Sequence, residues 1–329
     1  MRRLLLAFGI LFGLSSAVAA QSAGNTSPPS SPWPTKPIKV IVPLTAGSAT
    51  DVMARIVFDQ VSQQVGQPIF IENRPGAGNS IGMSAVAKAD PDGYTILANS
   101  SSHTVSPAVR ANMPLDTAND LAAVVPLGNM PVVIVFNPKK GYKQLSDFVE
   151  WAKANPGKAN YSSAGAGNSS HLNGELFRLA GGFQAVHLPF KGAPEAMTEV
   201  IAGRSDFYFS PLVNALPLMR DGQLQALAVS NSQRASALPD VPTVAEAGYP
   251  KSEYNFWAGI FLPVKTPDAI KQKLYAEIAK ALGTPTVREK LANLGADPFR
   301  ISSAQFDALV RQEIETNTQI ARAANIKVE

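Results

Sequence analysis

The chain has 329 residues, of which 45% are hydrophobic and 16% are charged, and it contains no cysteine. This apolar content excludes a wholly disordered protein, and the length suits two α/β domains. The lack of cysteine excludes thiolate metal sites and cysteine nucleophiles. The 29 basic and 25 acidic residues nearly balance and form no Lys/Arg run, which excludes an electrostatic surface for nucleic acid.

The first 20 residues have the three parts of a secretory signal peptide. Arg2 and Arg3 form a basic start, an apolar run of 11 residues covers 4–14, and an Ala-Val-Ala cleavage site follows. A membrane anchor would need about 20 apolar residues. We therefore expect residues 1–20 to direct export and to be removed, and the Ser/Pro-rich residues 21–32 to form a disordered lead-in.

The region after this leader begins with a β-α-β-α-β pattern over residues 38–99. Short β-branched runs alternate there with segments whose apolar residues recur at helical spacing. Such alternation predicts a parallel sheet with right-handed crossovers. Strands are expected at 39–43, 68–71 and 94–98, and helices at 51–65 and 80–89.

A second α/β pattern follows, and the C-terminal third is mainly helical. Strands are expected at 132–136, 159–162, 185–190, 206–210, 224–230 and 256–264, and helices at 146–154, 169–179 and 193–202. Three further helices are expected at 267–283, 285–295 and 303–324, the last begun by a capping box of Ser302 and Gln305.

The chain is expected to cross between two lobes twice, near Asn129 and near Phe256. These crossings assign residues 33–128 and 256–329 to the first lobe and residues 129–255 to the second. Two crossings form a hinge, so a cleft is expected between the lobes.

Ligands of open parallel sheets bind beyond the carboxyl ends of the strands. The loops expected there are rich in Gly, Ser, Thr and Asn and nearly free of charge: 44–51, 99–107, 162–171, 191–194 and 210–211. Free N–H groups at helix starts favour an anion such as a carboxylate. One such loop is an ordinary connector, but several at the same edge predict a binding site.

Candidate ligand contacts on these loops include Ser101, Lys191 and Ser210. His103 and His171 could donate to a ligand, although a polar helix start explains His171 equally well. No two histidines have a metal-ligand spacing, and no pair of catalytic carboxylates stands out. The sequence therefore predicts neither a metal nor a cofactor.

One motif favours an enzyme. Residues 78–82 (GNSIG) match G-x-S-x-G, the nucleophile elbow of hydrolases, with Ser80 as the nucleophile. The preceding turn makes Ser80 more plausible as a helix cap, and no HGGG-type oxyanion motif is present. Gly76, Gly78 and Gly82 approach a dinucleotide fingerprint, but the last spacing is one residue too long.

Several long stretches together carry a family pattern: VIVPLTAGSATD, GQPIFIENRPGAGNSIG, KADPDGYTILANSS, YSSAGAGNSSHLNGELF and RASALPDVPTVAEAGYP. The chain resembles the receptor components of tripartite tricarboxylate transporters, known as the Bug family, over almost all of its length after the leader. The resemblance implies a periplasmic binding protein type II-like α/β fold, with two lobes and a cleft that closes on a small carboxylate. It also implies a non-catalytic monomer in the Gram-negative periplasm that docks on a membrane permease.

The resemblance also implies two ligand-binding regions, one on each lobe. The first is Thr45, Ala46, Gly47, Ser48, Ala49, Thr50 and Asp51. The second is Ser163, Gly165, Gly167 and Asn168.

This chain departs from the family pattern at two places. Many relatives have a Gly-Gly pair where this chain has Gly47-Ser48, and an acid where it has Ser210. The missing acid argues against a ligand amine, so a dicarboxylate or an aromatic carboxylate is expected in preference to an amino acid. A receptor that presents its ligand to a membrane sensor, and a periplasmic esterase that uses Ser80, are the alternatives.

Overall fold

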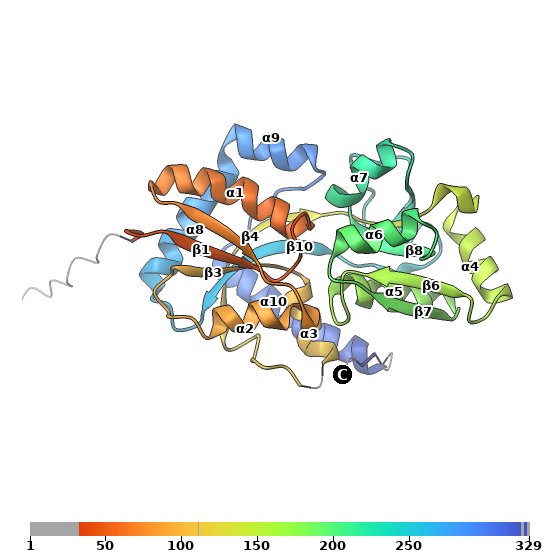
Figure 1. Ribbon diagram of the computed structural model, residues 1–329, viewed down its shortest axis with the longest axis horizontal. Coiled ribbons are helices and arrows are strands. Elements are labelled where there is room, and N and C mark those ends of the chain that lie inside the picture. The colour runs from red at the N-terminus through yellow and green to blue at the C-terminus, as the bar shows by residue number, and fades with distance from the viewer. Residues whose placement is uncertain (1–32, 111, 324–325, 328–329) are drawn as a thin grey trace, which may run out of the picture. The chain divides into compact units, whose positions relative to one another are not determined.

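The computed structural model describes residues 33–110, 112–323 and 326–327. The expected signal peptide and lead-in lie outside these residues. Residues 34–329 form one compact unit that contains two five-stranded sheets, each with its own helices (Figure 1). In the described part of the chain, no helix combines the length and the apolar character that a bilayer span requires.

The first sheet has the strand order β2-β1-β3-β10-β4. Its strands are β1 (Ile38–Val42), β2 (Ile69–Asn73), β3 (Thr95–Ser100), β4 (Leu121–Met130) and β10 (Phe256–Pro263). β1 pairs in parallel with β2 and β3, whereas β10 runs antiparallel to both β3 and β4. The parallel part therefore confirms the pattern expected for residues 38–99.

Helices cover both faces of this sheet (Figure 1). They are α1 (Ala49–Val65), α2 (Ser80–Ala87), α3 (Ser102–Val109), α8 (Asp268–Gly283), α9 (Pro285–Asn293) and α10 (Ser303–Ala323), with a short 3₁₀ turn η1 (Ala77–Asn79) before α2. α1 packs against α8, and α10 packs against α3 and β4. The expected capping box begins α10, since Gln305 N–H donates to Ser302 Oγ at 3.2 Å and Ser302 N–H donates to Gln305 Oε1 at 2.9 Å.

The second sheet has the order β7-β6-β8-β5-β9 and repeats the design of the first. Its strands are β5 (Val132–Phe136), β6 (Ala159–Ser163), β7 (Ala185–Pro189), β8 (Phe207–Pro211) and β9 (Gln225–Val229). β6 is parallel to β7 and β8, and β5 is antiparallel to β8 and β9. The associated helices are α4 (Leu145–Ala154), α5 (Ser169–Gly181), α6 (Ala193–Ile201) and α7 (Leu212–Arg220), with 3₁₀ turns η2 (Pro138–Lys140) and η3 (Pro250–Ser252).

The chain passes between the sheets at Pro131 and again before Phe256, where the two passages lie side by side. Met130 at the end of β4 pairs with Phe256 at the start of β10. On the second-lobe side of this pair, Ser230 N–H donates to Val132 O at 2.7 Å and Tyr254 N–H donates to Ser230 O at 2.8 Å. Backbone hydrogen bonds thus join the two passages into a single connection between the lobes.

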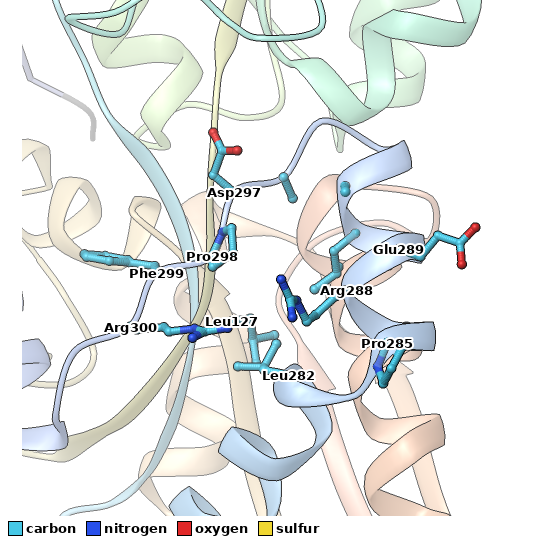
Figure 2. Close-up of a pocket in the computed structure, with 12 residues that line it drawn as sticks. Leu127, Leu282, Pro285, Arg288, Glu289, Asp297, Pro298, Phe299 and Arg300 are labelled. Atoms are coloured by element: carbon cyan, nitrogen blue, oxygen red, sulfur yellow. The ribbon is translucent and has the colours of Figure 1, made fainter.

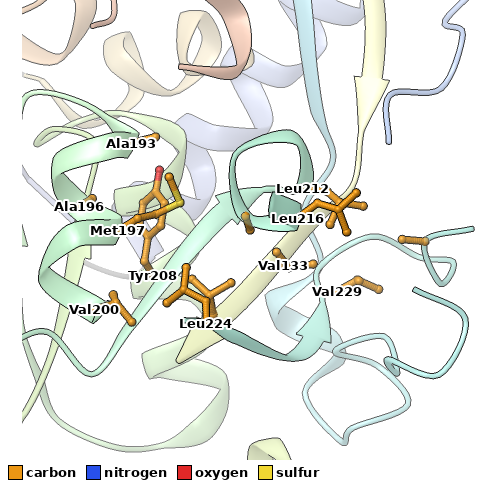
Figure 3. Packing of buried hydrophobic residues seen from close by; sticks show 13 residues of the cluster. Val133, Ala193, Ala196, Met197, Val200, Tyr208, Leu212, Leu216, Leu224 and Val229 are labelled. Carbon is orange, nitrogen blue, oxygen red and sulfur yellow. The ribbon is translucent and has the colours of Figure 1, made fainter. Parts of the chain in front are cut away.

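Each sheet has its own apolar core. In the first lobe, Trp257, Phe261 and Phe306 pack together between β10 and α10. In the second lobe, α6 and α7 pack on β5 and β8 around Val133 and Tyr208 (Figure 3). Buried apolar area of this kind contributes about 25 cal/mol per Å², so each lobe has its own source of stability.

Three elements of the structure were not predicted from the sequence. α3 occupies much of the expected loop 99–107, α7 follows β8 directly, and β4 precedes the first crossing. Pro107 lies inside α3 and Pro217 inside α7, and Pro126 and Gly128 lie inside β4. Proline and glycine disfavour regular structure in isolation, but tertiary packing outweighs that preference here.

Candidate functional site

A narrow pocket lies between the two lobes, beyond the carboxyl ends of the parallel strands. Its lining comes from the starts of five helices: Ser48, Ala49 and Thr50 of α1, Ser102 of α3, Asn168, Ser169 and Ser170 of α5, Ala193 of α6, and Asn214 of α7. The rest of the wall consists of Leu44, Ser100, Val132, Ala164, Asn173, Tyr208, Phe209, Pro211 and Phe256. Every described residue that lines this cleft pocket is uncharged.

The start of α1 supplies anion-binding groups from the first lobe. The N–H groups of a helix's first turn have no partner within the helix and carry the positive end of its dipole. Ser48 is the N-cap residue of α1, yet its side chain makes no capping hydrogen bond. Ser48 Oγ and Thr50 Oγ1 are both buried without a hydrogen-bond partner among the described residues. Two hydroxyls and free N–H groups therefore face the same small space.

Asp51 holds this loop in place and is not itself a pocket residue. Its carboxylate accepts hydrogen bonds from Gly47 N–H at 2.9 Å and from Asn73 Nδ2 at 2.9 Å, and it pairs with Arg55 at 2.9 Å. Burial alone would raise the pKa of Asp51, but the hydrogen bonds from Arg55, Gly47 and Asn73 hold it below the usual value. Asp51 is therefore ionised, and its hydrogen bonds and ion pair fix the conformation of the 44–51 loop.

The start of α5 supplies the facing wall from the second lobe. Asn168 Oδ1 accepts from His171 N–H at 3.2 Å and from Ser170 Oγ at 2.8 Å, and Ser170 Oγ accepts from Ala164 N–H at 2.9 Å. Nearby, Asn173 Oδ1 is buried and has no hydrogen-bond partner within the described part of the chain. Burial raises the pKa of Tyr208, which keeps its phenol neutral at physiological pH.

Direct hydrogen bonds join the lobes around the pocket. Asn214 Nδ2 of α7 donates to Gly47 O at 2.7 Å, and Ser102 Oγ of α3 donates to Ser169 Oγ at 3.0 Å. On one side, Ser106 Oγ lies 2.6 Å from Gly78 O and 3.1 Å from Gly167 O. The cleft pocket itself has a volume of about 30 Å³, only a few times what a single water needs. The cleft between the lobes is therefore closed in this structure.

Four predicted contacts line this pocket, namely Ser48, Ala49, Thr50 and Asn168. Thr45, Ala46 and Gly47 form the loop just before α1. This loop lies against the start of α6, so closely that a Cβ added to Gly192 would lie 1.7 Å from Thr45 Oγ1. Close backbone approach between the lobes thus depends on glycine at position 192.

The loop before α5 contains Ser163, Gly165 and Gly167, and hydrogen bonds to its neighbours hold it in position. Ser163 Oγ lies 2.6 Å from His187 Nε2, and Gly165 N–H donates to Ser163 Oγ at 3.2 Å. Gly167 N–H donates to His171 Nδ1 at 3.2 Å. The rings of His171 and His187 stack with centroids 3.9 Å apart. These histidines therefore support the loop, and neither lines the pocket.

Ser101, His103 and Ser210 are buried beside the pocket and do not line it. The ring of His103 stacks on Phe261 at 4.1 Å inside the first lobe, and burial lowers its pKa to about 4. Ser210 Oγ lies 3.1 Å from Pro211 O and 3.5 Å from Met197 Sδ. The contacts of His103 and Ser210 therefore lie within their own lobes in this structure, and a ligand contact of either residue stays a prediction.

Lys191 lies in a second, outer pocket of about 530 Å³ next to the cleft pocket. Residues 76–79 and Arg110 line one side of this outer pocket, and residues 164–166 with Lys191 line the other. Arg110 Nη2 donates to Ala166 O at 3.1 Å across it. The outer pocket thus has two basic residues, Lys191 and Arg110, and one acidic residue, Glu195.

Sequence reasoning missed the pocket contributions of Asn214, Tyr208, Asn173 and Ser102. Ser102 lies on α3 and Asn214 lies on α7, the two helices that were not predicted because each contains a proline. The alternation of β8 could have indicated Tyr208, because residues two apart on a strand share a face.

Ser80, the nucleophile of the alternative hydrolase reading, lies at the start of α2. Its Oγ donates to Ala77 O at 2.8 Å. The four residues Gly76, Ala77, Gly78 and Asn79 all have positive φ, from 44° to 125°, so the turn is left-handed throughout. Ser80 closes that turn, and its hydroxyl is engaged by the backbone of the turn.

A mainly apolar cavity lies elsewhere in the first lobe, between α8, α9 and residues 296–300 (Figure 2). It shares no lining residue with the cleft pocket. Helix starts and unpartnered polar groups occur in the cleft pocket, which is why we regard the cleft as the principal site.

Two α/β lobes joined by two adjacent strand passages, with an uncharged pocket of helix starts between them, define a bilobal solute-binding protein. Residues 53–326 match the family described as tripartite tricarboxylate transporter family receptor. The chain belongs to this family, whose members are periplasmic solute-binding proteins and not enzymes.

Individual relatives agree with this assignment. The protein BugT of Bordetella pertussis is 34% identical over 332 residues, which cover 100% of this chain and 99% of BugT. The structure of MatC from Rhodopseudomonas palustris with bound malate is 31% identical, covers 88% of this chain and 99% of MatC, and has a TM-score of 0.84. A second R. palustris protein, with adipate, is 29% identical, with coverage of 90% and 99% and a TM-score of 0.86.

Proposed function

We propose that this chain captures a small carboxylate between its lobes and delivers it to the membrane permease of a tripartite transporter. The observation that carries the proposal is the start of α1, where free N–H groups and the hydroxyls of Ser48 and Thr50 face an uncharged pocket. Malate in MatC and adipate in the second R. palustris protein support a carboxylate ligand.

The polar groups of the pocket favour a particular kind of carboxylate. Asn214 donates through Nδ2 to Gly47 O, so its Oδ1, which is buried without a partner in the described structure, is available only as an acceptor. A hydroxyl group on the ligand would donate to it. A ligand ammonium would meet no carboxylate, because every described lining residue is uncharged.

Ser210 itself contacts Met197 inside the second lobe, so the uncharged lining of the cleft is what disfavours an amine. We therefore infer a di- or hydroxycarboxylate without an amine as the ligand.

Closure is the proposed mechanism of capture. The ligand shifts the equilibrium only by its greater affinity for the closed state. A micromolar Kd corresponds to about −8 kcal/mol, and a few hydrogen bonds to a charged group, each about 1.5–3 kcal/mol, are of the right size. The moving bodies would be the lobes 33–128 with 256–329 and 129–255, each with its own sheet.

The cellular setting of the proposal follows from the leader and the family. Residues 1–20 would direct export to the Gram-negative periplasm and be removed there. The mature chain would act as a monomer and meet its permease at the membrane surface. A test of this part is the size of the secreted protein, which should lack the first 20 residues in mass spectrometry.

A thermal-shift screen of carboxylates tests the ligand proposal. At 100 times Kd, a ligand that binds only the native state adds about 2.7 kcal/mol, which is a rise in Tm of about 4 °C for a chain of about 300 residues. We expect this rise with small di- or hydroxycarboxylates and not with their diamides. Stabilisation by aspartate or glutamate alone would overturn the proposal.

The double variant Ser48→Ala/Thr50→Val tests whether the start of α1 is responsible. It removes two hydroxyls with little change of shape, and we expect the carboxylate-induced shift to fall by at least about half. Thr286→Val, at an exposed threonine of α9, is the matched control and should leave the shift unchanged.

A further inference from the structure

The cavity in the first lobe has a size and a shape suited to a small molecule. Its volume is about 450 Å³, within the range of ligand pockets. α8 and α9 form one side, and the segment of residues 296–300 forms the other (Figure 2). It is thus a separate site on the molecule, built entirely from the first lobe.

The walls of this lobe-1 cavity are mainly apolar. Leu127 of β4 and Leu291 of α9 are buried at its base, with relative exposures of 2% and 7%. Leu282, Pro285 and Phe299 continue the apolar surface towards solvent. Such walls gain free energy by covering the apolar body of a ligand.

The charges at its rim are arranged to suit an anion. The side chains of Arg288 and Arg300 point into the cavity, whereas the carboxylates of Glu289 and Asp297 point away from it (Figure 2). Neither guanidinium has an ion pair or a hydrogen bond within the described part of the chain. Elsewhere on the surface, arginines commonly pair with a carboxylate, as do Arg55, Arg74, Arg178, Arg204, Arg234 and Arg311.

We propose that this cavity binds a second ligand, a soluble monocarboxylate with an apolar chain or ring. Arg288 and Arg300 hold the carboxylate, since a guanidinium offers donors in a geometry that matches it. The apolar tail lies between Leu127, Leu282 and Leu291. Arg288 and Arg300 are exposed, so they favour a carboxylate over a neutral molecule through charge-assisted hydrogen bonds, and a second carboxylate would be placed in an apolar environment.

Octanoate is the probe for this second site, measured by isothermal titration calorimetry on the full mature protein. Ser48→Trp fills the cleft pocket, so binding that persists in this variant does not come from the cleft. In that background, we expect Arg288→Gln/Arg300→Gln to weaken octanoate binding by about tenfold or more. Arg220→Gln/Arg322→Gln changes the charge equally at exposed arginines on α7 and α10 and should have less than about a twofold effect.

Three outcomes would overturn the proposal: equal binding of octan-1-ol, loss of octanoate binding in Ser48→Trp, or equal effects of the two arginine pairs. A crystal structure with 8-bromooctanoate gives an independent answer. We expect bromine density between Leu127 and Leu282, and density in the cleft alone would contradict the proposal. Failure here leaves the cleft proposal intact, because the carboxylate screen described above reads the cleft separately.

Discussion

Asn214 has its orientation determined by a contact between the lobes. Its Nδ2 donates to Gly47 O at 2.7 Å, and its Oδ1 has no partner among the described residues. The same side chain therefore joins the lobes and offers an acceptor to the ligand. Its importance depends on the closed state, because Gly47 and Asn214 belong to different lobes.

Asn214→Ala is expected to weaken the best carboxylate ligand by about tenfold, which corresponds to about 1.4 kcal/mol. Both the bond to Gly47 and the acceptor for the ligand are lost. Titration calorimetry measures the change. Asn293→Ala, at an exposed asparagine of α9, is the control, and an equal loss of affinity in both variants would contradict the role of Asn214.

His171 and His187 make the stability of the second lobe sensitive to acid. Burial lowers the pKa of His171 to about 4, and burial together with the neighbouring His171 lowers that of His187 to about 3. Both are neutral in the fold, while an unfolded histidine titrates near 6.5. Their contribution is full above pH 6.5 and is lost as the pH falls towards the folded values.

Between pH 7.5 and pH 5, we expect His187 to cost the wild type about 1–2 kcal/mol of unfolding free energy by this linkage. His187→Gln should lose correspondingly less over the same interval, although the substitution also changes the contact with Ser163. Urea unfolding at the two pH values measures the difference. An identical pH dependence in the variant would show that His187 does not remain neutral in the fold.

At the scale of elements, helix starts and tight loops determine how closely the lobes approach. Gly192, before α6, lies against Thr45, before α1. A Cβ at position 192 would lie 1.7 Å from Thr45 Oγ1 and 2.9 Å from Thr45 Cβ. No van der Waals contact allows either separation, so a side chain there forces the two loops apart.

Gly192→Ala should therefore leave each lobe folded and hinder closure. We expect affinity for the carboxylate to fall by about tenfold or more, with a larger radius of gyration in small-angle scattering at saturating ligand. Gly283→Ala, where a Cβ would meet nothing within 4 Å, is the control. Normal affinity in Gly192→Ala would mean that the contact between these loops is not needed for binding.

α10 connects the binding elements to the hinge through Glu313. Its carboxylate accepts from Trp257 Nε1 of β10 at 3.0 Å and from Thr104 Oγ1 of α3 at 3.1 Å. Burial raises the pKa of Glu313 to about 7, although these hydrogen bonds oppose the rise. Because the folded pKa lies above the unfolded value of about 4.3, Glu313 destabilises the fold as the pH rises from about 4 to 7.

Glu313→Gln keeps an acceptor for Trp257 and removes the ionisation. We expect Tm to rise by about 1–3 °C at pH 8 and to change little at pH 5. Differential scanning calorimetry at both pH values checks this. A destabilised variant at pH 8 would show that Glu313 is needed as a charged group.

At the scale of the whole molecule, two sheets of the same strand order, each with one antiparallel strand inserted, form the two halves of a receptor. Sequence patterns were sufficient for most strands and helices and for the loops at the strand ends, because hydrophobic periodicity and glycine are local signals. They failed where proline lies inside an element, as Pro107 does in α3 and Pro217 does in α7.

The pocket itself was only partly predictable. Ser48, Thr50 and Asn168 follow from local chemistry and family pattern, whereas the acceptor of Asn214 depends on a contact with Gly47, 167 residues away in the chain. His103 illustrates the reverse case, since its loop position suggested a ligand contact while packing against Phe261 places it inside the lobe. Contacts between distant segments leave no local trace in a sequence.

The most direct test of the account is a crystal structure of the mature protein with the carboxylate that raises its Tm most. We predict a closed cleft with the carboxylate within hydrogen-bond distance of the N–H groups at the start of α1 and of Ser48 Oγ and Thr50 Oγ1. A ligand hydroxyl should lie next to Asn214 Oδ1. A ligand bound through Lys191 and Arg110 in the outer pocket, with the start of α1 unoccupied, would contradict the account.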